Sequence, residues 1–197
     1  MLRTGIIILA AGNSSRMGRP KQLLDYKGKT LLQTVIDEAL KTNFKPVIVV
    51  LGANAEEIAK HHQTDEVTFV VNDSWEKGMA TSIVAGLSTL INNDSEIEST
   101  IIAVADQAFI KMSNFNNLIE KQKETGKNII ASKYAETIGT PVLFKEHYFD
   151  SLLSLTGDEG AKNLLKQYPQ DVETVVFEEG EIDIDTETDY NHLISQQ

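Results

Sequence analysis

The sequence predicts a three-layer α/β/α fold whose central sheet is mostly parallel, with some antiparallel strand in its second half. The first half alternates apolar strands with amphipathic helices, which is typical of a parallel sheet covered on both faces. The strand expected at 6–9 contains no polar residue, as a strand buried on both faces requires. Polar loops follow several strands, and ligands of such sheets bind beyond the carboxyl ends of the strands.

Length and composition predict one globular domain, which we expect to span residues 1–197 without a linker. No apolar run reaches the ~18 residues of a membrane span, and the run near the start is too short for a signal peptide. The net charge of −11 disfavours nonspecific binding of nucleic acid, which needs a basic face. The absence of cysteine excludes disulfides and a cysteine nucleophile. We therefore expect a cytoplasmic protein that binds neither nucleic acid nor membrane.

In the first half, apolar strands are predicted at 6–9, 46–51, 68–71 and 100–105. A capping box at Thr30 and Gln33 predicts the start of the first helix, which carries one apolar stripe. Asn54 and Glu57 repeat this pattern before a short helix. A third helix is predicted over 80–90.

The second half is less regular, and the antiparallel strand is expected there. Helices are predicted at 113–124, 147–153 and 160–167, and strands at 128–132, 140–144 and 174–177. Thr186 with Asp189 caps a helix at the C-terminal end.

The loop after the first strand concentrates cations in a chain that is acidic overall. Arg16, Arg19 and Lys21 lie within six residues, after a polar stretch that begins at Gly12. Free backbone N–H groups and fixed cations at a strand end suit a polyphosphate. The spacing matches neither the Walker loop nor the dinucleotide fingerprint. The alternative is an ordinary loop with solvated basic residues.

Two further polar residues are expected at the same edge of the sheet. Asp106 directly follows the strand at 100–105 and is a candidate Mg²⁺ ligand, because Mg²⁺ takes one or two protein carboxylates plus phosphate oxygens and waters. The alternative for Asp106 is a turn or helix cap. Asn72 follows the third strand, where its amide offers a donor and an acceptor to a base edge or serves as a turn residue.

These residues form motifs that resemble the nucleotidyltransferases with a Rossmann-like, glycosyltransferase-A-like fold. Residues 9–21 read Leu-Ala-Ala-Gly-x-x-x-Arg-Met-Gly-x-Pro-Lys, which resembles the signature of that superfamily. Further segments match in the family's order at 71–83, 105–107, 139–141, 157–162 and 183–186. As a set, they are most similar to the molybdenum-cofactor cytidylyltransferase group.

The resemblance implies Mg²⁺-dependent transfer of CMP from CTP to a phosphate-bearing acceptor, with release of pyrophosphate. The implied acceptor is molybdopterin carrying molybdenum, and the implied recipient of the product is a molybdenum hydroxylase. A phosphate monoester is already ionised at pH 7, so the chemistry needs positioning and charge neutralisation. The alternatives are cytidylyl, guanylyl or uridylyl transfer to an isoprenoid or sugar phosphate. A non-catalytic protein that binds nucleotide or cofactor for a molybdenum hydroxylase is a further alternative.

The resemblance also implies roles for individual residues. Lys21 is expected at the α-phosphate and Arg16 at the β- and γ-phosphates, and with Asp106 they form the catalytic set. Asp185 is the expected second metal ligand, with Asp183 as the alternative. The nucleotide contacts are expected to be Leu9, Ala10, Ala11, Gly12, Asn13, Ser14, Arg16, Lys21 and Asn72. The acceptor contacts are expected to be Gly78, Met79, Ala80, Thr81 and Ser82.

Base and acceptor selection follow from smaller features. Leu-Ala-Ala-Gly goes with cytidine in this family, which we attribute to the Ala11 methyl filling space that a purine needs. Backbone amides from Ala11 to Ser15 are expected to complete the phosphate cradle, and amides from Ala80 onward to hold the acceptor's phosphate. Arg19 is expected to face solvent.

Overall fold

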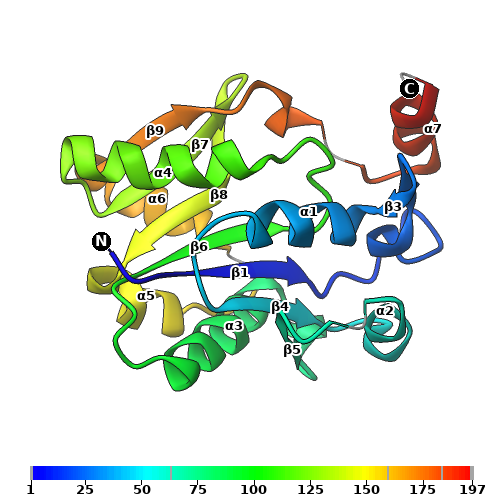
Figure 1. The fold of residues 1–197 in the computed structure, drawn as a ribbon, viewed down its shortest axis with the longest axis horizontal. Coiled ribbons are helices and arrows are strands. Elements are labelled where there is room, and N and C mark those ends of the chain that lie inside the picture. Colours follow the sequence, from blue (N-terminus) through cyan, green and yellow to red (C-terminus); the bar gives the residue numbers. More distant parts are fainter. Residues whose placement is uncertain (1, 63, 159, 183, 196–197) are drawn as a thin grey trace.

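The computed structural model describes residues 2–62, 64–158, 160–182 and 184–195, and Figure 1 shows how its elements are arranged. A seven-stranded sheet of order β5-β4-β1-β6-β8-β7-β9 forms the middle layer. Its strands are β1 Thr4–Ala10, β4 Val47–Leu51, β5 Thr68–Val71, β6 Ser99–Val104, β7 Ile129–Tyr134, β8 Thr137–Lys145 and β9 Val172–Val176. Only β8 runs antiparallel to its neighbours in this described sheet. The predicted fold class is therefore confirmed, including its antiparallel strand.

Helices cover both faces of the sheet (Figure 1). They are α1 Leu31–Leu40, α2 Ala55–His61, α3 Met79–Asn93, α4 Met112–Thr125, α5 Phe149–Leu153, α6 Lys162–Gln167 and α7 Glu187–Ser195. On one face α1, α2 and α4 pack around Ile6 and Ile8, and on the other α3, α5 and α6 pack around Ile7 and Leu9. Because neighbouring residues of β1 face opposite layers and both layers are apolar, residues 6–10 of this strand are all apolar. None of the helices in the described ranges combines the length and apolarity that a membrane span requires.

Several short elements carry no sequence pattern that predicts them. A hairpin pairs β2 Asp25–Tyr26 with β3 Lys29–Thr30 in a separate sheet. The same holds for the 3₁₀ helices η1 Lys21–Leu23, η2 Trp75–Lys77, η4 Pro169–Asp171 and η5 Glu178–Glu181, whereas η3 Glu146–Tyr148 overlaps the start of the helix predicted at 147–153. Segments of two to four residues are too short to show a helical or strand period, which is why the sequence does not reveal them.

The helix starts agree with the predicted caps at two places out of three. The Thr30 hydroxyl accepts a hydrogen bond from the Gln33 amide, although the Gln33 side chain bonds within α1 instead of completing the box. The Thr186 and Asp189 side chains each accept from the other's backbone, which forms the predicted box of α7. The predicted cap at Asn54 is wrong: its side chain makes no capping bond, because the tight turn into α2 holds it in the left-handed region at φ 57°.

The last helix packs on the loop after β1. Ile184 and Leu193 from the C-terminal segment join Met17, Leu24 and Leu31 in one apolar cluster. Figure 1 shows α7 beside β3, far in sequence but adjacent in space. This packing brings the acidic residues before α7 to the cationic loop.

Candidate active site

A cavity of about 560 Å³ lies at the edge of the sheet where β1 and β6 end. Of the expected nucleotide contacts, residues 9–13 with Arg16 and Lys21 line it. Of the expected acceptor contacts, Gly78, Met79 and Ser82 line it. The cavity therefore lies beyond the carboxyl ends of the strands, where the sequence predicts ligand binding.

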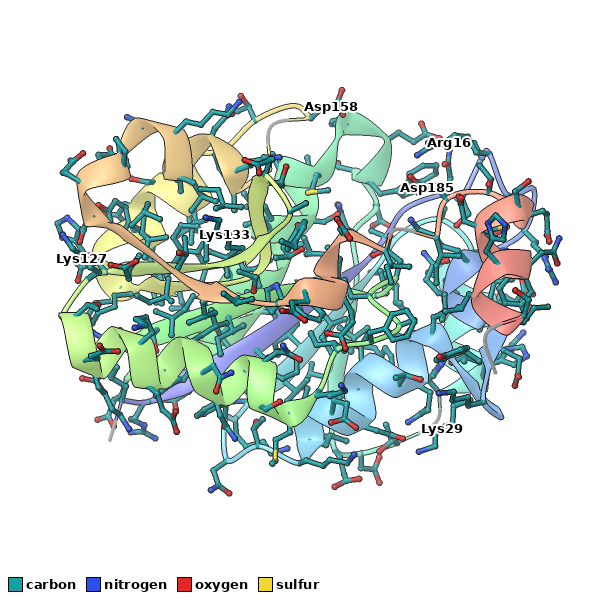
Figure 2. All side chains as sticks on the ribbon, turned by 90° about the horizontal axis from the view of Figure 1, so that it is seen from above. Arg16, Lys29, Lys127, Lys133, Asp158 and Asp185 are labelled. Carbon is teal, nitrogen blue, oxygen red and sulfur yellow. The ribbon has the colours of Figure 1, made fainter. Side chains whose placement is uncertain are left out.

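Lys21 is held between the two carboxylates that the sequence nominates as metal ligands. Its Nζ donates to Asp106 Oδ2 at 2.5 Å and to Asp185 Oδ1 at 3.2 Å. Arg16 Nη2 donates to Asp185 Oδ2 at 2.7 Å, and Figure 2 shows these two side chains beside each other. Residues from three distant parts of the chain thus form one charged network.

The two cations of this network differ in burial. The side chain of Lys21 is 20% exposed and that of Arg16 is 69% exposed. Burial by itself lowers the pKa of the Lys21 ammonium, but Asp106 and then Asp185 outweigh burial, so this pKa lies above its ordinary value. Lys21 is therefore protonated at neutral pH. The guanidinium of Arg16 is exposed, so it is free to move toward a bound ligand.

Asp106 presents a buried oxygen that the rest of the described chain leaves unpaired. Its Oδ2 accepts from Lys21, while its Oδ1 accepts no hydrogen bond. An unpaired buried acceptor is costly, and a divalent cation relieves that cost. Carboxylate oxygens are the hard ligands that Mg²⁺ takes, so the residues present fit such an ion.

The protein supplies few ligands for that ion. The described residues hold no group of three or more His, Cys, Asp or Glu side chains with metal-ligand geometry. Mg²⁺ typically keeps waters and takes substrate phosphates beside one or two carboxylates, so Asp106 and Asp185 suffice. The alternative ligand, Asp183, lies outside the described residues.

The loop after β1 is shaped by Gln22, which the sequence alone does not single out. Gln22 is 2% exposed, and its Nε2 donates to the carbonyls of Ala10 at 2.8 Å and Gly12 at 3.0 Å. A buried polar side chain that bonds to backbone carries no periodic signal. Its position directly after Lys21 is the only sequence feature that could have drawn attention to it.

Ser14 and Ser15 do not take the places expected of them. Ser14 is not on the cavity wall, and its hydroxyl accepts from the Lys21 backbone amide at 3.0 Å. The Ser15 amide donates to Asn13 Oδ1 at 3.1 Å. The Ser15 amide is therefore not free to donate to a phosphate, as the expected cradle of amides from Ala11 to Ser15 requires.

Asn72 makes the contacts of a turn residue, one of the two roles that the sequence leaves open. It is 6% exposed and does not line the cavity. Its Oδ1 accepts from the Ser74 amide at 3.0 Å, and its Nδ2 donates to Thr81 Oγ1 at 2.8 Å and Ser82 Oγ at 3.0 Å. With its carboxamide engaged in this way, Asn72 acts on the site by holding the start of α3.

The start of α3 does not offer the expected amides to an acceptor. The Ala80 amide donates to Gly157 O at 3.2 Å, and the Thr81 amide to Gly78 O at 3.2 Å. Neither Ala80 nor Thr81 lines the cavity. Gly78 adopts φ 106°, and a Cβ there would lie 2.3 Å from Gly157 O, so only glycine permits this contact.

Trp75 and Asp158 complete the cavity wall on the side of α3. Figure 2 shows Asp158 apart from Arg16 and Asp185, on another segment nearer the middle of the molecule. The sequence contains a motif at 157–162 but does not indicate which of its residues reaches the cavity.

Arg19 does not simply face solvent. Its Nε and Nη2 donate to Glu187 Oε1 at 2.8 Å and Oε2 at 3.1 Å, and its guanidinium lies 5.3 Å from the ring centre of Tyr190. The Tyr190 hydroxyl donates to Asp25 O at 2.8 Å. These contacts fasten α7 to the loop that carries Lys21.

Arg19→Ala is expected to loosen α7 relative to the sheet. Bidentate pairing and the ring contact are lost, so amide hydrogen exchange within α7 should speed up about threefold to tenfold. Exchange in β1 and β6 should not change. Lys60→Ala removes an exposed ion pair with Glu56 elsewhere and serves as the control. Equal changes in α7 for both variants would contradict this role of Arg19.

Comparison with known proteins gives one family match and several relatives. The sequence pattern of the MobA-like NTP transferase domain matches residues 6–172. The chain is 30% identical over 196 residues to the purine catabolism protein PucB of Bacillus subtilis (strain 168), covering 94% of this chain and 93% of PucB. It is 30% identical over 172 residues to nicotine blue oxidoreductase of Paenarthrobacter nicotinovorans, covering 83% of this chain and 81% of that protein.

Among solved structures, Rv0371c of Mycobacterium tuberculosis H37Rv superposes with a TM-score of 0.87 at 28% identity, covering 98% of both chains. A second structure of Rv0371c is a complex with manganese, and it superposes with a TM-score of 0.82 at 26% identity over 98% of both chains. The likeness therefore extends over nearly the whole chain, including the C-terminal segment that carries Asp185.

Proposed function

The chain belongs to the MobA-like NTP transferase family, and from this premise we propose that it transfers CMP from CTP to a phosphate-bearing acceptor and releases pyrophosphate. The observation that carries the proposal is Lys21, held between Asp106 and Asp185 on a cavity that also exposes the glycine loop. The Lys21 ammonium, together with a divalent cation that the two carboxylates would hold, can position two anions and offset the charge that their reaction develops. Because Asp185 lies beyond the matched segment, we propose that residues 1–197 act as one domain.

In the proposed reaction, an ionised oxygen of the acceptor's phosphate attacks the α-phosphorus of CTP. The bond to the bridging oxygen breaks, its electron pair leaves with pyrophosphate, and no proton has to be removed first. Lys21 offsets the charge that develops on the α-phosphate. Arg16 binds the β- and γ-phosphates, since a planar guanidinium can bind two oxygens. A divalent cation, which Asp106 and Asp185 would hold, supplies further neutralisation of phosphate oxygens when bound.

We propose Mg²⁺ as that cation. The fit of a hard ion to two carboxylates supports it, as does the manganese complex of the related Rv0371c.

The acceptor side is proposed to lie beyond Met79. A second pocket of about 170 Å³ shares Leu9, Met79 and Val104 with the main cavity and continues to Thr140. Of the expected acceptor contacts, Gly78 and Ser82 line the main cavity but not this second pocket. Molybdopterin carrying molybdenum is the proposed acceptor, on the strength of the motif set, and a molybdenum hydroxylase is the proposed recipient of the product.

Pyrophosphate release tests this proposal directly. The protein with Mg²⁺, CTP and molybdenum-bearing molybdopterin is expected to release pyrophosphate, and CTP should stabilise the fold against heat more than ATP, GTP or UTP. Binding of nucleotide without any release would instead support the accessory role.

A second candidate function comes from nicotine blue oxidoreductase, one of the two curated relatives described above. Trp75 on the cavity wall offers a face on which a flat aromatic substrate could stack. An oxidoreductase needs an electron donor, so the same thermal measurement includes NADPH as a probe. Stabilisation by NADPH, with none by the four nucleoside triphosphates, would favour a reductase over a transferase.

Ala11→Gly is expected to improve the use of GTP relative to CTP. Ala11 is 8% exposed on the cavity wall, and one methyl discriminates between ligands by about 1–3 kcal/mol. The ratio of kcat/KM for GTP to that for CTP should therefore rise about tenfold, without necessarily reversing the preference. If the unmodified protein already uses GTP better than CTP, the cytidylyl assignment is wrong, whereas the phosphate and metal assignments stand.

A further inference from the structure

We propose that Gln22 is a positioning residue that turns the backbone of residues 10–13 into an anion cradle. The proposal rests on the proposed nucleotide chemistry only in that the anion is a polyphosphate. Gln22 acts through the backbone and not on the reacting atoms.

Three successive carbonyls of the loop are held by the protein. Gln22 uses both hydrogens of its side-chain amide, one on Ala10 O at 2.8 Å and one on Gly12 O at 3.0 Å. The carbonyl between them, Ala11 O, accepts from the Ala53 amide at 3.1 Å. All three carbonyl oxygens therefore accept hydrogen bonds from the protein.

The peptide geometry then decides where the donors point. In a trans peptide the N–H and the preceding C=O point in opposite directions. The carbonyls of Ala11 and Gly12 face the protein, so the amides of Gly12 and Asn13 face away from it. Within the described part of the chain these two amides donate no hydrogen bond, and both residues line the cavity. Successive free N–H groups of this kind bind anions.

Gln22 also links this cradle to the catalytic cation. It directly follows Lys21, whose backbone amide donates to Ser14 Oγ at 3.0 Å. The same hydroxyl donates to Gln22 Oε1 at a long 3.5 Å. One buried side chain thus fixes the loop's peptide planes and borders the residue that presents the ammonium group. An apolar side chain of similar length cannot fix these peptide planes, because Ala10 O and Gly12 O would then lack hydrogen-bond donors.

Gln22→Met tests the role, with tripolyphosphate as a ligand that carries neither base nor acceptor. Trp75 is the single tryptophan and lines the cavity, so its fluorescence reports binding. The affinity for tripolyphosphate with Mg²⁺ should fall about tenfold or more in Gln22→Met, because two carbonyls lose their donors and the peptide planes can turn. Gln33→Met in α1, whose side chain bonds Asp37 within its own helix, is the matched control and should bind as the unmodified protein does.

The outcomes separate a positioning role from a merely structural one. A folded Gln22→Met protein that keeps the unmodified affinity overturns the proposal, even if it melts earlier. Should Gln22→Met not fold, Gln22→Glu decides, since it keeps the length and loses both donors. No binding of tripolyphosphate by the unmodified protein also overturns the cradle. Binding that depends on Gln22, without nucleotidyl transfer to any acceptor, rejects the proposed function and leaves the role of Gln22 standing.

Discussion

Asp106→Asn is expected to lower kcat for pyrophosphate release by at least about 10²–10³-fold while the fold stays intact. Asparagine keeps the size of the side chain at the end of β6. It removes the negative charge of the carboxylate, whose Oδ2 pairs with Lys21 and whose buried Oδ1 is unpaired. The loss should appear in Mg²⁺-dependent turnover at saturating CTP and acceptor.

A matched change keeps this result interpretable. Asp150 is exposed on α5 and does not line the cavity, so Asp150→Asn should leave turnover unchanged. Both variants should melt within a few degrees of the unmodified protein, since Lys21 still has Asp185 as a partner. Near-normal turnover from a folded Asp106→Asn protein would remove Asp106 from the site.

Lys21→Met is the second change with a large expected effect, and it should lower kcat about 10²–10³-fold, more than it raises KM for CTP. The ammonium matters most as charge develops on the α-phosphate, so its loss acts on the transition state. Arg16→Ala should show the opposite balance, a raised KM with a smaller loss of kcat, because its guanidinium is exposed and its proposed partners are the β- and γ-phosphates, at which the acceptor does not attack. The reverse pattern in steady-state kinetics would mean that the two roles are exchanged.

The same variant has a consequence that does not depend on turnover. Without the ammonium, Asp106 and Asp185 face each other with no cation between them, so their repulsion is no longer screened. Mg²⁺ should therefore raise the Tm of Lys21→Met more than it raises that of the unmodified protein. Lys29→Met, which loses an exposed pair with Asp37, is the control and should respond to Mg²⁺ as the unmodified protein does. An equal response of all three proteins would contradict a metal site at these carboxylates.

The strands and helices could be predicted because their signals are local. The apolar run at 6–9 became β1, and the stripe after Thr30 became α1, since periodic burial depends on neighbours along the chain. The cap expected at Asn54 is wrong because its backbone conformation does not depend on the local pattern alone. The side-chain type fits a cap, but the turn from β4 sets a backbone that the local pattern does not show.

The position of the cavity could also be predicted, whereas the contacts within it could not. Alternating strands and helices place the carboxyl ends of β1, β5 and β6 at one edge, so the loop cations and Asp106 had to lie near each other. Asn72 shows the limit. Its chemistry suits a base edge equally well, and only the packing of the turn against α3 shows that its amide is already used.

The sequence by itself determined the α/β layers, the sheet edge that carries the site and the cationic loop, because hydrophobic period and motif spacing are properties of short segments. Only the tertiary structure decided that Asp185 meets Lys21 across 164 residues, that Arg19 fastens α7, and that Gln22 holds the loop's carbonyls. Each of these is a pairing between polar groups that packing brings together. A buried polar group takes the partner that the folded chain delivers to it, and the sequence around that group carries no record of which partner this is.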